Sequence, residues 1–146
     1  MASSYRLTPL RRTVNALVTP LARLGIAGKR THILTVPGRT TGRRYSTPVE
    51  LVIAGDDRWL VAPYGERAWV KNARAAGEVE LTRGRATARW RIAELAPEEA
   101  APVLREYLRT TPVVRAYFDI NPDAPLEAFV AEAPRHPVFR LLGGEQ

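Results

Sequence analysis

The chain has 146 residues, 45% of them hydrophobic and 25% charged, which is the composition of one folded domain (residues 1–146) with a real core. It has no cysteine, so disulfides and thiolate catalysis are excluded. With only two histidines, far apart in the sequence, a zinc site or a Ser-His-Asp triad is poorly supplied, and we expect no metal site. The net charge of +7 favours a small anionic partner, a membrane surface or a nucleic acid.

An amphipathic helix is predicted at the N-terminus, within residues 1–27. Apolar residues recur at helical spacing from Leu7 to Leu24, with a kink expected at Pro20 and a stop at Gly25. Two interpretations stay open. The helix either packs its apolar stripe on the domain, or contacts a membrane surface or covers a pocket through a basic amphipathic face. No stretch reaches the roughly 20 apolar residues of a membrane span, so we expect a cytoplasmic protein, with membrane association left open.

From Thr31 onward the pattern predicts strands. The alternation is clearest in residues 86–95, where Ala88, Trp90 and Ile92 share one face. Glycine- and aspartate-containing turns near positions 55 and 84 indicate hairpins. The other strand segments read "THILTV", "VELVI", "WLVAPY", "VELTR" and, near the end of the chain, "HPVFRLL".

Helices are predicted between and after these hairpins. "RAWVKNARAAG" is typical of a short helix closed by Gly77, and "APEEAAPVLREYLRT" begins with Pro97 and two acidic residues. "TPVVRAYFDI" and "PLEAFVAEA" are shorter helical candidates. We therefore expect an α+β, mainly β fold, in which five or six mostly antiparallel strands over residues 31–142 form a small β-barrel covered by helices.

The segment "GRTTGRRYSTPVE", residues 38–50, is rich in hydrogen-bond donors. Its two early glycines allow close approach of a ligand, and its arginines and hydroxyl groups suit an anion. It lacks the spacing of a P-loop or a Rossmann turn. A solvated basic turn explains the same composition equally well, so the segment alone decides nothing.

Trp69 and Asn72 follow shortly after the turn "VAPYG" and lie three residues apart, so they share a helix face. Together they could hold a flat polar heterocycle beside the basic loop. The alternative is a core tryptophan with an asparagine that bonds to nearby backbone.

In this order and spacing, "GRTTGRRYSTPVE", "APYG" and "WVKNARAAGEVEL" resemble motifs of the deazaflavin-dependent nitroreductase family, over about Thr31 to Arg91. The resemblance implies a split β-barrel of the FMN-binding type and coenzyme F420 as the cofactor, with FMN as the alternative. It also implies hydride transfer between the reduced deazaflavin and a small electrophilic acceptor, either a quinone, an enone or a nitroaromatic.

The resemblance also implies which residues bind the coenzyme. The loop would hold its phosphate and acidic tail, the entry to the next strand would run beside the deazaflavin ring, and the turn and helix that follow would contact the ring edge. These positions are Arg39, Thr40, Thr41, Gly42, Arg43, Arg44, Tyr45, Ser46, Thr47, Pro48, Ala62, Pro63, Tyr64, Gly65, Trp69 and Asn72.

Departures from the family pattern bear on the substrate. Thr40 and Tyr45 replace the lysine and arginine of many relatives, so the anion contacts are expected to be rearranged. Tyr107, Tyr117 and Phe118 are candidates for the substrate pocket, although packing on the barrel explains them as well. A proton could come from water or from the hydroxyl of Tyr64 or Ser46.

Rival functions are a split-barrel protein that binds a cofactor or lipid without turnover, and an FMN-dependent oxidoreductase. A nucleic-acid partner is not expected, because the basic residues are spread along the chain and no binding motif is present. A homodimer is compatible with the fold class, in which dimers are common.

Overall fold

The computed structural model describes residues 30–145, so the N-terminal helix predicted within residues 1–27 lies outside the described residues. This part of the chain contains six strands, three α-helices and two 3₁₀ helices. In chain order they are β1 (Thr31–Pro37), β2 (Arg44–Ala54), β3 (Asp57–Val61), α2 (Ala68–Ala76), β4 (Glu78–Arg83), β5 (Ala86–Glu94), α3 (Pro97–Thr110), η1 (Pro112–Tyr117), α4 (Leu126–Glu132), η2 (Ala133–Arg135) and β6 (Val138–Glu145).

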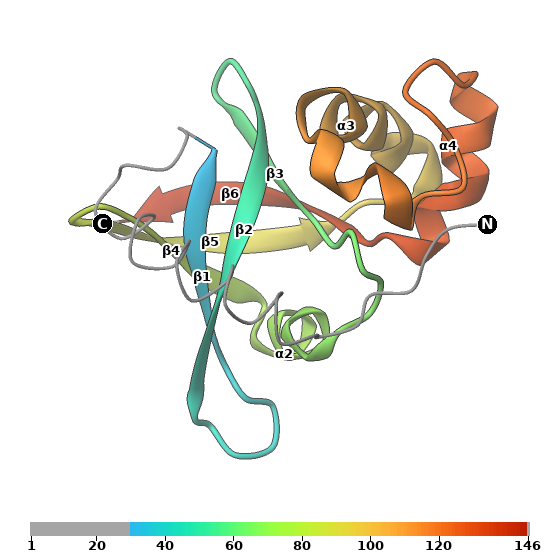
Figure 1. Ribbon diagram of the computed structural model, residues 1–146. Coiled ribbons are helices and arrows are strands. Elements are labelled where there is room, and N and C mark those ends of the chain that lie inside the picture. The colour runs from blue at the N-terminus through green and yellow to red at the C-terminus, as the bar shows by residue number, and fades with distance from the viewer. Residues whose placement is uncertain (1–29, 146) are drawn as a thin grey trace.

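The strands form a closed antiparallel barrel in the order β1-β2-β3-β6-β5-β4 (Figure 1). This confirms the predicted mainly β barrel, the two hairpins and the terminal strand. β6 bonds to both β3 and β5, and β1 bonds to β4, so each of the six described strands has a neighbour on both sides.

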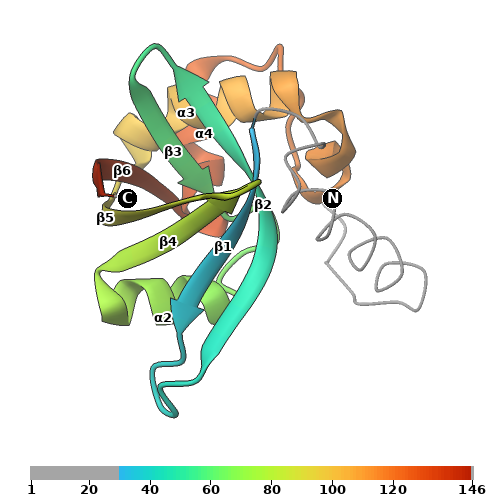
Figure 2. The ribbon, with the colours of Figure 1, turned by 90° about the vertical axis from the view of Figure 1, so that its left-hand side faces the viewer.

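β2 begins five residues earlier than the alternation in "VELVI" predicts. Residues 44–46 extend the ladder with β1 down to the pair Pro37–Arg44, and these three residues are exposed. An arm that has solvent on both faces carries no apolar alternation, so its sequence resembles a loop. Figure 2 shows this arm extending below the barrel alongside β1.

Two apolar cores lie on opposite faces of the sheet. Neighbouring residues such as Leu60 and Val61 point into different cores, because successive side chains of a strand alternate between its faces. The core inside the barrel is closed by α2 and includes Leu34, Leu51, Leu60, Val70, Val79 and Phe139. The second core, under α3 and α4, includes Val52, Val61, Leu104, Leu108, Phe129 and Val138.

The helices form as the sequence predicts, with one difference. α3 begins at Pro97 with Glu98 and Glu99 in its first turn, where the helix dipole favours acids. The segment "TPVVRAYFDI" forms the 3₁₀ helix η1 and not an α-helix, because it spans six residues between Thr111 and Phe118, both of which have non-helical backbone. Within the part of the chain that is described, no helix is long and apolar enough to cross a membrane.

Candidate functional site

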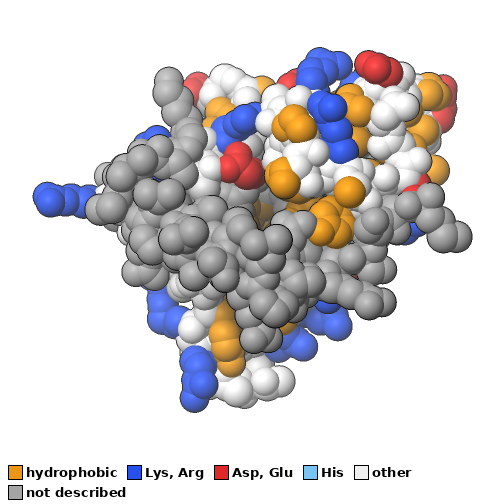
Figure 3. All heavy atoms as spheres, in the orientation of Figure 1, with side chains coloured by type: hydrophobic (Ala, Val, Ile, Leu, Met, Phe, Trp, Pro, Cys, Tyr) orange, Lys and Arg blue, Asp and Glu red, His pale blue; other side chains and the backbone are white. Residues whose placement is uncertain are grey.

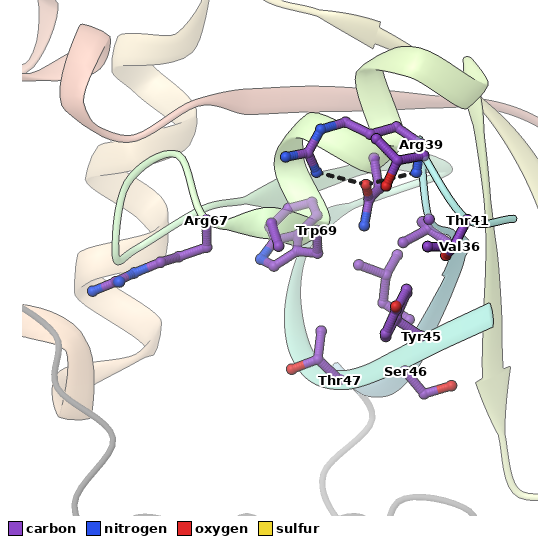
Figure 4. A pocket seen from close by; sticks show the side chains of 13 residues that line it. Val36, Arg39, Thr41, Tyr45, Ser46, Thr47, Arg67 and Trp69 are labelled. Atoms are coloured by element: carbon purple, nitrogen blue, oxygen red, sulfur yellow. Dashed lines mark hydrogen bonds between the residues drawn. The ribbon is translucent and has the colours of Figure 1, made fainter. Parts of the chain in front are cut away.

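A cavity of about 440 Å³ opens between the β1–β2 loop and α2 (Figure 4). Its volume lies in the range of small-molecule sites, which is about 300–1,000 Å³. The base is apolar and the rim is polar. The lining residues are Leu34, Val36, Gly38, Arg39, Thr40, Thr41, Tyr45, Ser46, Thr47, Arg67, Ala68, Trp69 and Asn72.

The register between β1 and β2 builds one wall of the cavity. Tyr45 lies opposite Val36, and Thr47 lies opposite Leu34, so all four side chains share the cavity face. Ser46 belongs to the other face, where its hydroxyl oxygen is 2.8 Å from that of Thr35. The Ser46 side chain accordingly points away from the cavity in Figure 4, and only its backbone contributes to the wall.

Two glycines shape the loop at the rim. A side chain at Gly38 would come within 2.8 Å of both Thr41 Oγ1 and the Tyr45 ring, so the close turn has room for hydrogen only. Gly42 has a φ of 72°, which other residues adopt at a cost. Four loop N–H groups, those of Gly38, Arg39, Gly42 and Arg43, donate within the protein. The N–H groups of Thr40 and Thr41, at the tip of the loop, are not among them.

Arg39 and Asn72 connect the loop to α2. Asn72 Oδ1 accepts one hydrogen bond from the backbone N–H of Arg39, at 3.0 Å, and a second from its Nη1, at 2.8 Å. Asn72 is 4% exposed, so the accepting amide is buried, whereas Arg39 lies at the exposed rim. The amide therefore fixes the backbone and the guanidinium of Arg39 together, which leaves the other guanidinium N–H groups to face a ligand.

Trp69 forms the wall on the α2 side. The helix is held against the barrel by Val70 and Ala73, which are fully buried, and Gly77 ends it in the left-handed conformation. The ring of Trp69 lies 6.2 Å from that of Phe139 inside the barrel. Trp69 and Asn72 therefore share a helix face, as the spacing predicts, and that face borders the cavity.

The cavity is electrostatically suited to an anion. Arg39 and Arg67 lie in its lining, and among the described lining residues there is no Asp or Glu. Figure 3 shows Lys and Arg side chains around the lower end of the molecule, where Figure 1 places the β1–β2 loop and α2. A positive surface around an apolar pocket raises the local concentration of anionic ligands.

The structure brings only half of the predicted site residues into the cavity wall. Arg39, Thr40, Thr41, Tyr45, Ser46, Thr47, Trp69 and Asn72 line it. Gly42, Arg43, Arg44 and Pro48 lie on the same hairpin outside the wall, and the Arg44 guanidinium pairs with Glu80 on β4. Arg43 and Arg44 are thus placed beside the cavity rather than in it.

Most of the turn Ala62–Gly65 faces the helical layer instead. Ala62 packs in the core inside the barrel, and its N–H donates to the Pro137 carbonyl at 2.9 Å. The Tyr64 and Tyr117 rings pack edge to face, with their centroids 4.7 Å apart. Pro63 and Gly65 also lie against this layer, close to His136 and Arg135. The turn leads through Arg67 into α2, so it adjoins the cavity through chain connectivity.

Five lining residues were missing from the sequence-based set, namely Leu34, Val36, Gly38, Arg67 and Ala68. The alternation in "THILTV" places Leu34 and Val36 on one face, but local pattern alone cannot show whether that face meets core or ligand. Arg67 and Ala68 directly precede Trp69, so extending the motif by one helical turn would have included them.

Comparison with protein families identifies the family of the chain. A family model described as F420H(2)-dependent quinone reductase matches residues 8–137. The chain belongs to this family. It is an F420-dependent reductase, and its cofactor is coenzyme F420, as the resemblance of the loop and helix motifs implied. No match was found among curated proteins.

Solved structures support the fold. A protein described as an F420-H2 dependent reductase is 19% identical, with a TM-score of 0.55, and the match covers 77% of this chain and 94% of that one. A FAD-binding protein from Mesorhizobium loti is 17% identical, with a TM-score of 0.51 and coverages of 96% and 91%. A protein described as a domain-swapped dimer is 16% identical, with a TM-score of 0.56 and coverages of 92% and 99%. These likenesses establish the split β-barrel.

The residues of the cavity fit the coenzyme of this family. A deazaflavin coenzyme combines a flat ring with phosphate and carboxylate groups, and the cavity combines an apolar base and an indole with arginines and hydroxyls. Arginine binds phosphate and carboxylate through paired N–H groups. The cavity is also open, which leaves room for an extended anionic tail to continue over the surface near Arg43 and Arg44.

Proposed function

We propose that the cavity between the β1–β2 loop and α2 is the coenzyme site, and that the enzyme uses the reduced coenzyme to reduce a small quinone. The observation that carries this proposal is the arginine held by a buried amide at the rim of an apolar pocket. Arg39 is fixed at two atoms by Asn72 before any ligand arrives, so little conformational entropy is lost when it binds an anion.

Each part of the wall has a role in this proposal. Arg39, with the hydroxyls of Thr40 and Thr41, binds the phosphate of the coenzyme, while Arg43 and Arg44 attract its acidic tail. Leu34, Val36 and Trp69 supply an apolar surface for the ring and exclude water from it. The side chain of Thr47 and the backbone of Ser46 border the ring. Pro48 and the turn Ala62–Gly65 lie outside the cavity wall and support the strand and the helix that form it.

When bound, the reduced coenzyme supplies a hydride from C5 of its deazaflavin. The protein's share of catalysis is orientation and exclusion of water, so no side chain needs to act as nucleophile or base. The Ser46 hydroxyl lies against that of Thr35, and the Tyr64 ring packs on Tyr117 in the helical layer. A proton from water is therefore the simplest source.

A titration tests the site. Purified protein should quench the fluorescence of the oxidised coenzyme at micromolar levels. Arg39→Gln should weaken binding by about 10- to 100-fold, the effect of losing a hydrogen bond to a charged group worth roughly 1.5–3 kcal/mol. Arg109→Gln is the matched control, because it removes one positive charge from an exposed position on α3, away from the cavity.

Two results would contradict the proposal. One is equal weakening by both arginine variants, which would mean that only net charge matters. The other is tight binding of FMN by the wild-type protein with no response to the deazaflavin. That result would favour the FMN-dependent alternative, for which the FAD-binding neighbour is a precedent of fold. Coenzyme binding without oxidation by any acceptor would instead favour the non-catalytic binding protein.

Turnover with a panel of acceptors distinguishes the substrate classes. The family description favours menadione, a quinone, over nitroaromatics and enones. The pocket offers aromatic and aliphatic surface beside Arg67, which suits a flat and partly anionic reduction product.

A homodimer is a further proposal, supported by the domain-swapped neighbour, and sedimentation velocity measures it directly. Contact with a membrane through the N-terminal segment stays a separate prediction, and a vesicle flotation assay would test it.

A further inference from the structure

The turn between β3 and α2 is held from one side by the residue pair that precedes β6. The Pro63 carbonyl accepts a hydrogen bond of 2.9 Å from His136 Nδ1, and Pro137 O accepts one of 2.9 Å from Ala62 N–H. A carbonyl oxygen can only accept, so Nδ1 carries a hydrogen whatever the charge of the ring. His136 therefore bonds to backbone that lies 73 residues earlier in the chain.

His136 itself has no freedom to turn. It is 4% exposed, and the Phe118 ring stacks on it at 3.8 Å with an angle of 14° between the planes. Its Nε2 lies 2.9 Å from Glu132 Oε1. Glu132 in turn accepts hydrogen bonds from the Arg135 guanidinium, at 2.8 Å to each oxygen, and from the Asp119 N–H at 3.2 Å. The imidazole is thus fixed at both nitrogens and on one face.

This arrangement bears on the cavity because the turn continues directly into it. The Gly65 and Arg67 amides donate to Ala62 and Gly65 carbonyls, and Val70 N–H donates to Arg67 O, so the backbone forms one connected series from Ala62 to α2. Arg67, Ala68 and Trp69 then line the cavity. A shift at Pro63 would reach these three residues through this short, hydrogen-bonded turn.

We propose that His136 is a positioning residue for the coenzyme. Through its Nδ1–H it fixes the Pro63 carbonyl, and thereby the angle at which Arg67 and Trp69 meet the ligand. It touches neither coenzyme nor substrate. This inference rests on the proposed coenzyme site, and it assigns a function to a buried histidine that hydride transfer does not use. A role in stability alone is the alternative, in which the Glu132 contact matters as much as the Pro63 contact.

Two conservative variants separate these roles. Asparagine places its amide N–H close to the position of Nδ1, whereas glutamine places it close to Nε2. His136→Asn therefore keeps the bond to Pro63 and loses the contact with Glu132, and His136→Gln does the reverse. We expect coenzyme to bind His136→Asn within about threefold of wild type and His136→Gln at least tenfold more weakly, with similar melting temperatures. Equal affinities in the two variants would overturn the proposal, as would losses that follow melting temperature.

Hydrogen–deuterium exchange of the coenzyme-free proteins gives an independent readout. His136→Gln should speed exchange of the amides of residues 65–70, and His136→Asn should leave them protected. Protection in both variants would overturn the proposal. The exchange measurement needs no coenzyme. If the wild-type protein failed to bind the coenzyme, the proposed function would be refuted, but the exchange rates would still test the role of His136.

A third variant covers the case in which His136→Gln does not fold. Glu132→Gln keeps a hydrogen-bonding partner for Nε2 but removes the negative charge of the network, so it lowers stability while leaving the Pro63 bond. Coenzyme affinity should be unchanged in the folded protein. A drop in affinity of tenfold or more in Glu132→Gln would show that the network acts through general stability, which contradicts the role assigned to Pro63.

Discussion

Single residues at the cavity rim hold the β1–β2 loop in one shape before a ligand arrives. Asn72 is the most constrained of these, because one buried oxygen accepts both hydrogen bonds from Arg39. Gly38 is the second, since Thr41 and Tyr45 close over it. Both residues fix the shape of the loop, and neither carries a charge.

Replacing Asn72 by Asp keeps the acceptor oxygen and adds a negative charge. Asn72→Asp should fold, because the new carboxylate pairs with Arg39 and keeps its position. It should bind the coenzyme at least tenfold more weakly, because the anion site then contains an anion of its own. Thermal unfolding and fluorescence titration measure the two effects. A variant that binds as tightly as wild type would show that the coenzyme phosphate lies elsewhere.

Gly38→Ala and Gly55→Ala make a matched pair of glycine changes. An added methyl group at Gly38 meets the side chains of Thr41 and Tyr45 at 2.8 Å. These two side chains line the cavity and must shift, so coenzyme affinity should fall severalfold. At Gly55, where φ is 60° and nothing lies within 4 Å, the methyl group costs roughly 1 kcal/mol of stability through backbone strain alone. Gly55→Ala should therefore unfold earlier and bind the coenzyme normally. Equal binding by both variants would contradict this account.

At the scale of elements, the half-buried His32 on β1 and the buried His136 before β6 make the stability of the fold depend on pH. Burial lowers the pKa of His32 below its ordinary value of 6.5, and the nearby Arg83 and Arg58 add to this effect. Burial likewise lowers the pKa of His136, and the Glu132 carboxylate offsets it only in part. For Glu132, burial raises the pKa, but hydrogen bonds from Arg135 and His136 outweigh it and hold the pKa below 4.5.

All three shifts have the same consequence for stability. Below pH 6.5 the unfolded chain binds protons at its histidines more readily than the folded protein does. The free energy of unfolding should therefore fall as pH decreases from about 6.5 through the folded-state pKa values, with a further loss below pH 4.5 from Glu132. Urea unfolding between pH 8 and 5 measures the slope. A His32→Asn, His136→Asn double variant should flatten it, and an unchanged slope would assign the loss to other groups.

At the scale of the whole molecule, the two apolar cores have different roles. The core under α3 and α4 stabilises the domain, whereas the core inside the barrel also supports the cavity through Trp69 and Phe139. β2, β3 and β6 belong to both, since they are buried on both faces. The helical layer reaches the site through the turn after β3.

Core substitutions should reveal this division. Leu104→Ala, under the helical layer, should lower the free energy of unfolding by about 2–5 kcal/mol and leave coenzyme affinity unchanged in the folded protein. Phe139→Leu should cost less stability but weaken coenzyme binding severalfold, because it removes the ring that Trp69 packs against. Denaturant unfolding and titration at low temperature measure the two quantities. The reverse pattern would place the support of Trp69 outside the barrel core.

Local pattern determined much of this protein in advance. Alternation predicted the barrel strands, terminal glycines and prolines predicted the helix ends, and the order of three motifs predicted the deazaflavin family. These properties depend on whether each residue faces apolar or polar surroundings, which its near neighbours in sequence report. The exposed arm of β2 escaped prediction for the same reason, because solvent on both faces leaves no alternation to detect.

Only the tertiary structure decided which residues meet. Arg39 and Asn72 are 33 residues apart, and His136 and Pro63 are 73 apart. Their contacts depend on barrel closure and strand register, which no local pattern encodes. The same closure turned Arg44 towards Glu80 and placed the Ala62–Gly65 turn against the helices. The sequence by itself determined the family and the kind of cofactor, whereas the arrangement of the barrel decided which side chains can touch it.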